Sequence, residues 1–99
     1  MRKFEVYCGI EFDKDSKPVQ VNMDYLDDLA INYFGGYSRH YVEGGYKHTD
    51  GRIAKEQSVC YVVFAEDPHF PGIFAADCKI LANQESVCLV NPDGSVEFV

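Results

Sequence analysis

The sequence predicts an α+β fold in which two helices cover one face of an antiparallel sheet. Residues 3–12 alternate between apolar and polar side chains, which is the pattern of a strand with one buried face. Apolar residues then recur at helical spacing in two later segments, which begin near Met23 and Pro71. Residues 58–64, between these segments, are almost continuously apolar and predict a strand inside a sheet or at an interface.

A loop and a helix are predicted after the first strand. Residues 13–18 are polar and end in a proline, which indicates an exposed loop. Asn22 can cap the helix that follows, and the aspartates near its start lie at the positive end of the helix dipole. The Gly35-Gly36 pair predicts the end of this helix.

Two strands are predicted in the middle of the chain. Residues 37–47 are partly aromatic and β-branched, and the Gly44-Gly45 pair inside them indicates either a bulge or a close approach of two backbones. Asp50-Gly51 is a hairpin turn signal. Polar residues then lead into the apolar strand at 58–64.

The last part of the chain predicts a helix and two short strands. Pro71 suits the first position of the helix, and Asn83 closes it. Residues 86–90 form a strand, residues 91–94 a turn and residues 95–99 a final strand. The order is therefore β-α-β-β-α-β with an extra C-terminal strand, a ferredoxin-like sandwich whose right-handed crossovers put both helices on one face.

The other face of this sheet has no helix to cover it. A strand as apolar as residues 58–64 would leave a large patch exposed, so we expect the sheets of several chains to pack together. We favour a trimer, in which three sheets enclose a common core, and a dimer is the next choice. Alternation divides the strand into two sets without saying which set faces the helices: Val59, Tyr61 and Val63, and Cys60, Val62 and Phe64.

Length and charge restrict the class of protein. The chain has 99 residues, which predicts a single domain spanning 1–99. Its net charge of −7 disfavours direct binding to nucleic acid or to an anionic membrane, and favours cationic ligands or basic protein surfaces. The sequence contains neither a signal peptide nor an apolar run long enough to span a membrane, so we expect a cytoplasmic protein.

Cysteine and histidine usage adds a further expectation. The four cysteines lie in apolar stretches without a C-x-x-C pair, as expected for reduced core residues of a cytosolic protein. The three histidines share no metal-ligand spacing with them or with each other, so we expect neither a metal nor another cofactor. The sequence also lacks a phosphate-binding glycine loop and an evident catalytic triad.

Two groups of residues are candidates for a binding site. Tyr37, Gly44, Gly45 and Tyr46 combine aromatic faces with glycine backbone, which can hold a planar base or a cation; alternatively, these glycines and tyrosines only shape and cover the sheet. Glu56 and Glu85 each stand near the start of an apolar strand, where a cleft at a subunit boundary would bring them together, and Gln84 and Ser86 flank Glu85. The alternative is that both carboxylates are solvated charges at strand ends.

Short motifs support a resemblance over about residues 35–90. Gly44-Gly45-Tyr46, Glu56 ten residues later, and Gln84-Glu85 before a Val/Cys/Leu strand resemble the phage S-adenosylmethionine hydrolases, since described as lyases. That resemblance implies a trimeric ferredoxin-like assembly with active sites between subunits. The chain also resembles an uncharacterised bacterial family of small ferredoxin-like domains, through Tyr7-Cys8-Gly9, Asp50-Gly51-Arg52-Ile53 and Asn83 to Val87 among others.

The resemblance to the lyases also implies a reaction. The substrate's own carboxylate displaces methylthioadenosine and closes a homoserine lactone, without a cofactor, and in a phage this would serve anti-restriction in the host cytoplasm. Tyr46 would stack on or hydrogen-bond the substrate, Glu56 would face its positive or hydroxyl groups, and Glu85 would hold its ammonium. The remaining substrate-binding candidates are Tyr37, Gly44, Gly45, Gln84 and Ser86.

Two other functions stay open at this stage. The first is a non-catalytic phage inhibitor whose acidic face occupies a basic groove of a host nucleic-acid-binding enzyme. The carboxylates that suggest it are Asp13, Asp15, Asp24, Asp27 and Asp28. The second is a small-molecule sensor domain.

Overall fold

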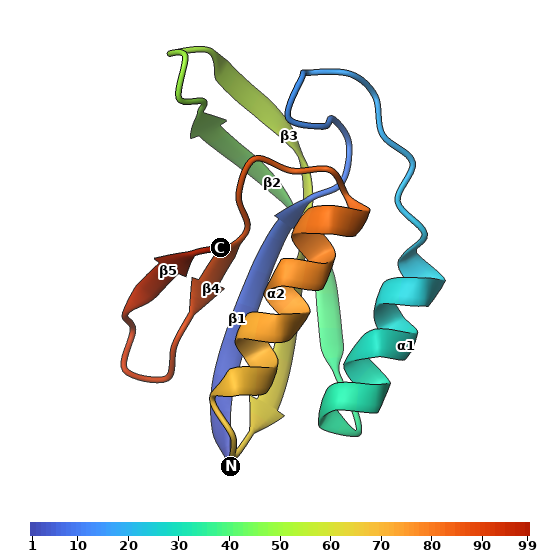
Figure 1. Ribbon diagram of the computed structural model, residues 1–99, viewed down its shortest axis with the longest axis vertical. Helices are drawn as coiled ribbons and strands as arrows, with labels where there is room; N and C mark the ends of the chain where they lie inside the picture. The colour runs from blue at the N-terminus through green and yellow to red at the C-terminus, as the bar shows by residue number, and fades with distance from the viewer.

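Five antiparallel strands form one sheet in the computed structural model, which describes residues 1–99. The strands are β1 (Arg2–Gly9), β2 (Ser38–Lys47), β3 (Ile53–Ala65), β4 (Cys88–Val90) and β5 (Val96–Phe98). The helices are α1 (Met23–Phe34) and α2 (His69–Leu81). In the sheet the strands run in the order β2-β3-β1-β4-β5, and both helices lie on the same face (Figure 1). The predicted α+β class, element order and extra C-terminal strand are confirmed.

The main difference from the prediction is the length of β3. It begins at Ile53 rather than at residue 58, because β2 pairs with it without interruption from Ser38↔Val62 to Lys47↔Ile53. Hydrogen bonding to β2 thus extends the strand through residues 53–57, where the sequence does not alternate between apolar and polar side chains. The ladder excludes the bulge as an interpretation of the glycine pair, since Gly44 and Gly45 pair in register with Glu56 and Lys55. A close approach exists only at Gly44, and it is to the side chain of Ser58 and not to a second backbone.

Other boundaries shift by a few residues. β1 ends at Gly9, and β4 begins at Cys88, two residues later than predicted. α2 begins at His69, so Pro71 occupies its third position and not its first. The predicted caps of α1 are confirmed, since Asn22 Oδ1 accepts the Tyr25 N–H at 3.1 Å and Gly35 ends the helix with a left-handed φ of 77°.

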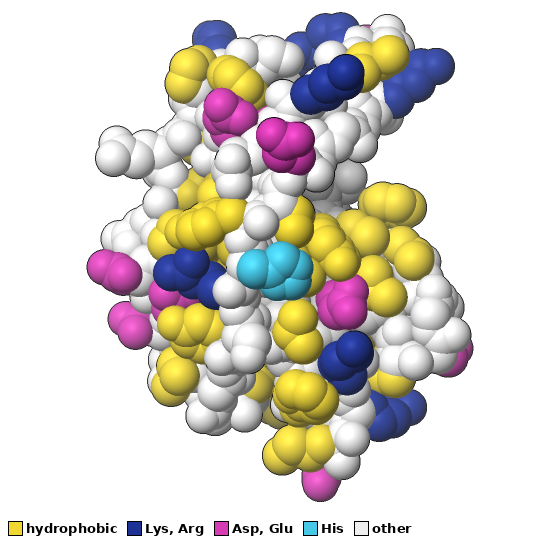
Figure 2. All heavy atoms as spheres, turned by 180° about the vertical axis from the view of Figure 1, so that it is seen from behind, with side chains coloured by type: hydrophobic (Ala, Val, Ile, Leu, Met, Phe, Trp, Pro, Cys, Tyr) yellow, Lys and Arg dark blue, Asp and Glu magenta, His cyan; other side chains and the backbone are white.

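The core lies between the sheet and the two helices. Val59, Tyr61 and Val63 of β3 are fully buried there, beside alternate residues of β1 and the inner sides of the helices. The other set of β3 residues therefore faces away from the helices. On that face Phe64 is 50% exposed and Phe98 of β5 is 76% exposed. Figure 2 shows this side, with hydrophobic side chains over its middle and lysine and arginine gathered at its upper end.

The cysteines fit the expectation of reduced, mostly internal thiols. All four are free; Cys8, Cys60 and Cys78 are buried, and Cys88 is partly buried. Burial raises the pKa of the Cys8 thiol to about 12, which keeps it protonated at neutral pH. Neither helix combines the length and the apolar character that a membrane crossing would need.

A polar network at Asp27 connects α1 to the sheet. Its carboxylate accepts hydrogen bonds from Arg39 of β2, at 2.8 and 3.2 Å, and from the Tyr61 hydroxyl at 2.6 Å. Partial burial raises the pKa of Asp27, but these donors outweigh it and the net pKa lies below the usual range. The hydroxyl of the largest buried side chain is thus paired at the edge of the core.

We expect Asp27→Ala to lower the free energy of unfolding by about 2–3 kcal/mol, because it leaves Arg39 and the Tyr61 hydroxyl without their acceptor. Asp28→Ala is the matched control, since Asp28 is exposed and its side chain makes no hydrogen bond. Because the pKa of Asp27 is lower in the folded state than in the unfolded state, its ionised carboxylate stabilises the fold at a pH above the unfolded pKa of about 4. This stabilisation is lost as the pH falls and the carboxylate becomes protonated. In urea unfolding, the difference in the free energy of unfolding between wild type and Asp27→Ala should therefore become smaller below about pH 4. Equal free energies of unfolding for Asp27→Ala and Asp28→Ala at pH 7 would contradict this role of Asp27.

Candidate functional site

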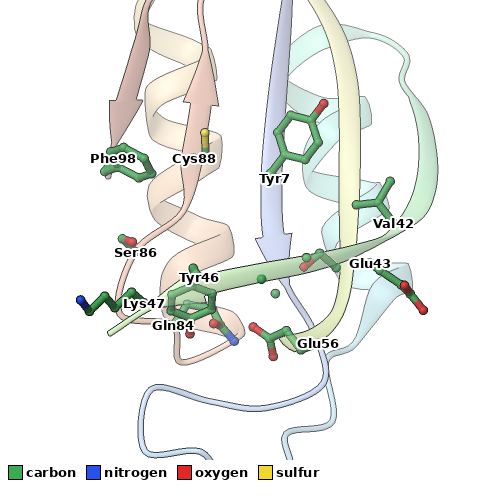
Figure 3. A pocket seen from close by; sticks show the side chains of 14 residues that line it. Tyr7, Val42, Glu43, Tyr46, Lys47, Glu56, Gln84, Ser86, Cys88 and Phe98 are labelled. Carbon is green, nitrogen blue, oxygen red and sulfur yellow. The ribbon is translucent and has the colours of Figure 1, made fainter. Parts of the chain in front are cut away.

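A cavity of about 620 Å³ opens on the sheet face that the helices leave uncovered. Its walls come from the end of β2, from β1 and β3, and from the segment that leads into β4 (Figure 3). Six of the eight predicted site residues line it: Gly44, Gly45, Tyr46, Glu56, Gln84 and Ser86. The other lining residues were not predicted as site residues; they are Tyr7, Gly9, Val42, Glu43, Lys47, Ser58, Cys88 and Phe98.

Glu56 is the most distinctive side chain of the cavity. It is only 5% exposed, although it lies on the open face of β3. Its Oε2 accepts the Phe12 N–H at 2.8 Å, whereas its Oε1 is buried without a hydrogen-bond partner. Burial raises the pKa of Glu56, and the Phe12 N–H opposes that effect only in part. A buried acceptor without a partner costs free energy, so this oxygen is suited to a donor that a ligand brings.

Gln84 is held by the backbone of Phe12, the residue whose N–H also holds Glu56. Its Nε2 donates to the Phe12 carbonyl at 2.8 Å and to the Ala82 carbonyl at 3.0 Å. The Phe12 backbone thus fixes the orientation of both polar side chains, one through its N–H and one through its carbonyl. Sequence reasoning missed Phe12 because the contribution comes from its backbone, which no side-chain pattern reports.

Two glycines make room for these side chains. A Cβ at Gly9 would overlap Glu56 Oε1 and lie 3.0 Å from Gln84 Oε1, and a Cβ at Gly44 would lie 2.8 Å from Ser58 Oγ. The φ of neither glycine requires the left-handed region, so both are needed for close approach and not for a turn. The sequence offered one signal for Gly9: it is a glycine at the end of an alternating strand, on the face away from the core.

Tyr46 forms part of the wall of the cavity (Figure 3). Its ring lies 4.7 Å from the His48 ring, centroid to centroid. Burial, together with the charges of Glu56 and Glu85, raises the pKa of the Tyr46 hydroxyl, which therefore remains a neutral hydrogen-bond donor at physiological pH.

The other two predicted residues, Glu85 and Tyr37, do not line the cavity. Glu85 pairs with His48, at 2.7 Å between Oε2 and Nδ1, and accepts the Thr49 N–H at 3.3 Å. These bonds lower the pKa of Glu85. Tyr37 packs its ring against Tyr61, 5.7 Å between centroids, on the side of the sheet that carries the helices. Alternation explains this placement, since Tyr37 stands an odd number of residues from Gly44 and Tyr46 and therefore faces the other way.

The cavity offers hydrogen-bond acceptors, hydroxyls and aromatic surface to a ligand. The carboxylate of Glu56 and the amide oxygen of Gln84 converge near Gly9, and Tyr7 and Tyr46 present rings to the same space. No group of three or more His, Cys, Asp or Glu side chains is arranged to hold a metal ion. The donor set suits an organic ligand that carries a positive charge or hydroxyl groups next to a planar ring.

Comparison with solved structures gives the same fold in a known class of enzyme. The chain is similar to a phage SAM lyase in complex with S-methyl-5'-thioadenosine, with a TM-score of 0.77 and 16% identity over 98% of this chain and 87% of that one. It is also similar to a phage SAM lyase in the apo state, with a TM-score of 0.73 and 18% identity over 98% and 86% of the two chains. No family model and no curated protein matches the chain. The resemblance that the short motifs indicated is thus confirmed in the fold.

We expect Gly9→Ala to disrupt the cavity, because the new methyl group would displace the Glu56 carboxylate from the Phe12 N–H. Overpacking of this kind costs about 1–3 kcal/mol of unfolding free energy. Gly36→Ala is the control, since nothing lies within 4 Å of a Cβ at that position. Chemical denaturation measures the loss; a Gly9→Ala protein as stable as Gly36→Ala would show that the close approach is not required.

Proposed function

We propose that this protein degrades S-adenosylmethionine in the cavity beside Glu56, as a lyase that needs no cofactor. The observation that carries the proposal is the unpartnered, buried Oε1 of Glu56, a residue that lines a cavity of a size suited to a nucleoside ligand. The fold supports it, since the similar structures are phage SAM lyases and one of them holds S-methyl-5'-thioadenosine. A phage origin, a role in anti-restriction and a place in the host cytoplasm belong to the same proposal.

The proposed reaction balances without a group from the protein. A carboxylate oxygen of the substrate forms a bond to the substrate's γ-carbon while the bond from that carbon to sulfur breaks. The electron pair stays on sulfur, so the sulfonium becomes the neutral thioether of methylthioadenosine, and the other product is homoserine lactone. No proton is transferred. The protein therefore has to fold the substrate into the reactive conformer and to complement its changing charge.

The cavity residues suit these two tasks. Glu56 would accept hydrogen bonds from the ammonium or the hydroxyl groups of the substrate, and Gln84 would offer its amide oxygen beside it. Tyr46 would stack on the ligand or bond to it through its hydroxyl. Ser86 adds a hydroxyl, and the backbone at Gly44 and Gly45 leaves space for close contact. The net charge of −7 attracts a substrate that carries a sulfonium and an ammonium.

The proposal includes an oligomer in which the uncovered sheet face is the subunit contact. The cavity opens on that face, and Phe98 at its edge is 76% exposed in the single chain. A second chain packed there would bury this apolar surface and close the cavity from water, which strengthens electrostatic interactions within it. We favour a trimer.

The two alternative functions have less support in the structure. The acidic cluster expected of an inhibitor is weakened, because Asp27 is neutralised by Arg39 and Asp13 accepts backbone N–H groups of its own loop. A sensor domain would use the same cavity for binding without turnover. Product formation separates this reading from the lyase.

We expect purified protein to convert S-adenosylmethionine to methylthioadenosine and Glu56→Gln to lower kcat/KM roughly 10- to 100-fold, because a charge-assisted hydrogen bond is lost. Chromatography of the products measures both rates. If the reaction needs Glu56 as a carboxylate, kcat/KM should fall when the pH drops and this side chain becomes protonated. Because the pKa of Glu56 is raised, this fall should occur at a higher pH than it would for an ordinary glutamate.

Glu66→Gln is the matched control for charge, because Glu66 is exposed and its side chain makes no hydrogen bond. Binding of S-adenosylmethionine without any methylthioadenosine would favour the sensor domain. If neither S-adenosylmethionine nor methylthioadenosine shifts the melting temperature, the lyase and the sensor are both ruled out for these ligands.

The two faces of β3 allow the proposed oligomer to be tested by substitution, since Tyr61 lies on the face toward the helices and Val62 on the uncovered face. We expect Val62→Glu to fold but to dissociate the oligomer, because Val62 lies on the uncovered face, and Tyr61→Glu to unfold, because Tyr61 is fully buried on the other face. Light scattering and circular dichroism measure the two effects. A wild-type mass equal to one chain of 11.2 kDa would exclude the oligomer.

A further inference from the structure

Glu85 and His48 connect two walls of the cavity that are far apart in the sequence. His48 follows β2 at the start of the β2–β3 hairpin, and Glu85 lies between α2 and β4 next to Gln84 and Ser86. The bond of 2.7 Å between Glu85 Oε2 and His48 Nδ1, with the Thr49 N–H on the other carboxylate oxygen, is a direct link between these segments. The His48 side chain is 2% exposed, so its imidazole is fixed inside the protein.

The buried imidazole supports the Tyr46 ring from behind. The two rings lie 4.7 Å apart at an angle of 51°. Tyr46 lines the main cavity and also a second one of about 230 Å³, which His48 lines as well. Tyr46 therefore borders two cavities, and packing on His48 is a contact that holds its ring in place.

We infer that Glu85 is a positioning residue, which acts through His48 to hold the Tyr46 ring in place for the ligand. The effect on catalysis rests on the proposed function, but the arrangement of the three side chains does not. This role differs from direct capture of a substrate ammonium by Glu85, since both carboxylate oxygens already accept bonds within the protein and Glu85 does not line the cavity.

Positioning of Tyr46 through His48 and direct capture of the substrate ammonium predict different results when Glu85 is replaced by a neutral residue. In Glu85→Gln the amide oxygen can accept the Thr49 N–H while the amide nitrogen donates to a neutral imidazole, so the link survives without charge. In Glu85→Ala the link is lost. We expect Glu85→Gln to stay within about threefold of the wild-type KM for S-adenosylmethionine, and Glu85→Ala to raise KM about tenfold, as for the loss of one charge-assisted hydrogen bond.

The same variants are tested without ligand by NMR. Cross-relaxation between the Tyr46 and His48 ring protons should be present in wild type and Glu85→Gln and lost in Glu85→Ala. His48→Gln gives a second readout, because its amide can still reach Glu85 but has no ring for Tyr46; its KM should rise as in Glu85→Ala. Glu97→Ala removes one exposed charge that forms no ion pair, and should match wild type.

Each result decides the inference. A Glu85→Gln protein as impaired as Glu85→Ala would overturn it in favour of a direct charge contact, and so would a wild-type KM or intact ring contacts in Glu85→Ala. If the wild-type protein does not turn over S-adenosylmethionine, the proposed function fails. The positioning role is then decided by the ring contacts in the unliganded variants alone.

Discussion

Alternation of side chains along β3 gives the molecule two faces with different tasks. Val59, Tyr61 and Val63 point to the helices and are fully buried, while the residues between them point to the side that no helix covers. Two helices of this length can cover only one face of the sheet (Figure 1). The core that stabilises the fold therefore lies on the helix side of the sheet, and the cavity lies on the uncovered side.

The cavity depends on placing a carboxylate within a largely apolar sheet face. Glu56 is nearly as buried as the core, yet only one of its oxygens is paired within the protein. Three features permit this arrangement: the missing side chain at Gly9, the N–H of Phe12, and Gln84 held by the Phe12 carbonyl. Glu56 lies on β3, whereas the three features lie at the end of β1, in the loop after it and in the segment before β4, so the site exists only when these four segments come together.

The proposed reaction is consistent with a cavity that contains no evident catalytic triad and no cluster of metal ligands. An intramolecular displacement takes both its nucleophile and its leaving group from the substrate. What it needs from a protein is a fixed shape and fixed dipoles, because these lower the barrier by orientation and by complementing charge. Rigid support behind the cavity then matters as much as the residues that touch the ligand. The Phe12 backbone supports Glu56 and Gln84, and we assign the corresponding role for Tyr46 to His48 and Glu85.

The sequence by itself determined the α+β class, the order of the elements, the caps of α1 and six of the 14 residues that line the cavity. These features are local: they depend on periodicity, on Asn22 and Gly35, and on polar residues beside glycines. Tertiary structure decided the rest. The length of β3 follows from pairing with β2, and the placement of Tyr37 on the helix side follows from register. Glu85 was predicted as a site residue, but its partner His48 lies 37 residues away, and only the folded chain brings the two together. Phe12 and Gly9 contribute a backbone group and an empty space, which become visible once neighbouring segments are packed against them.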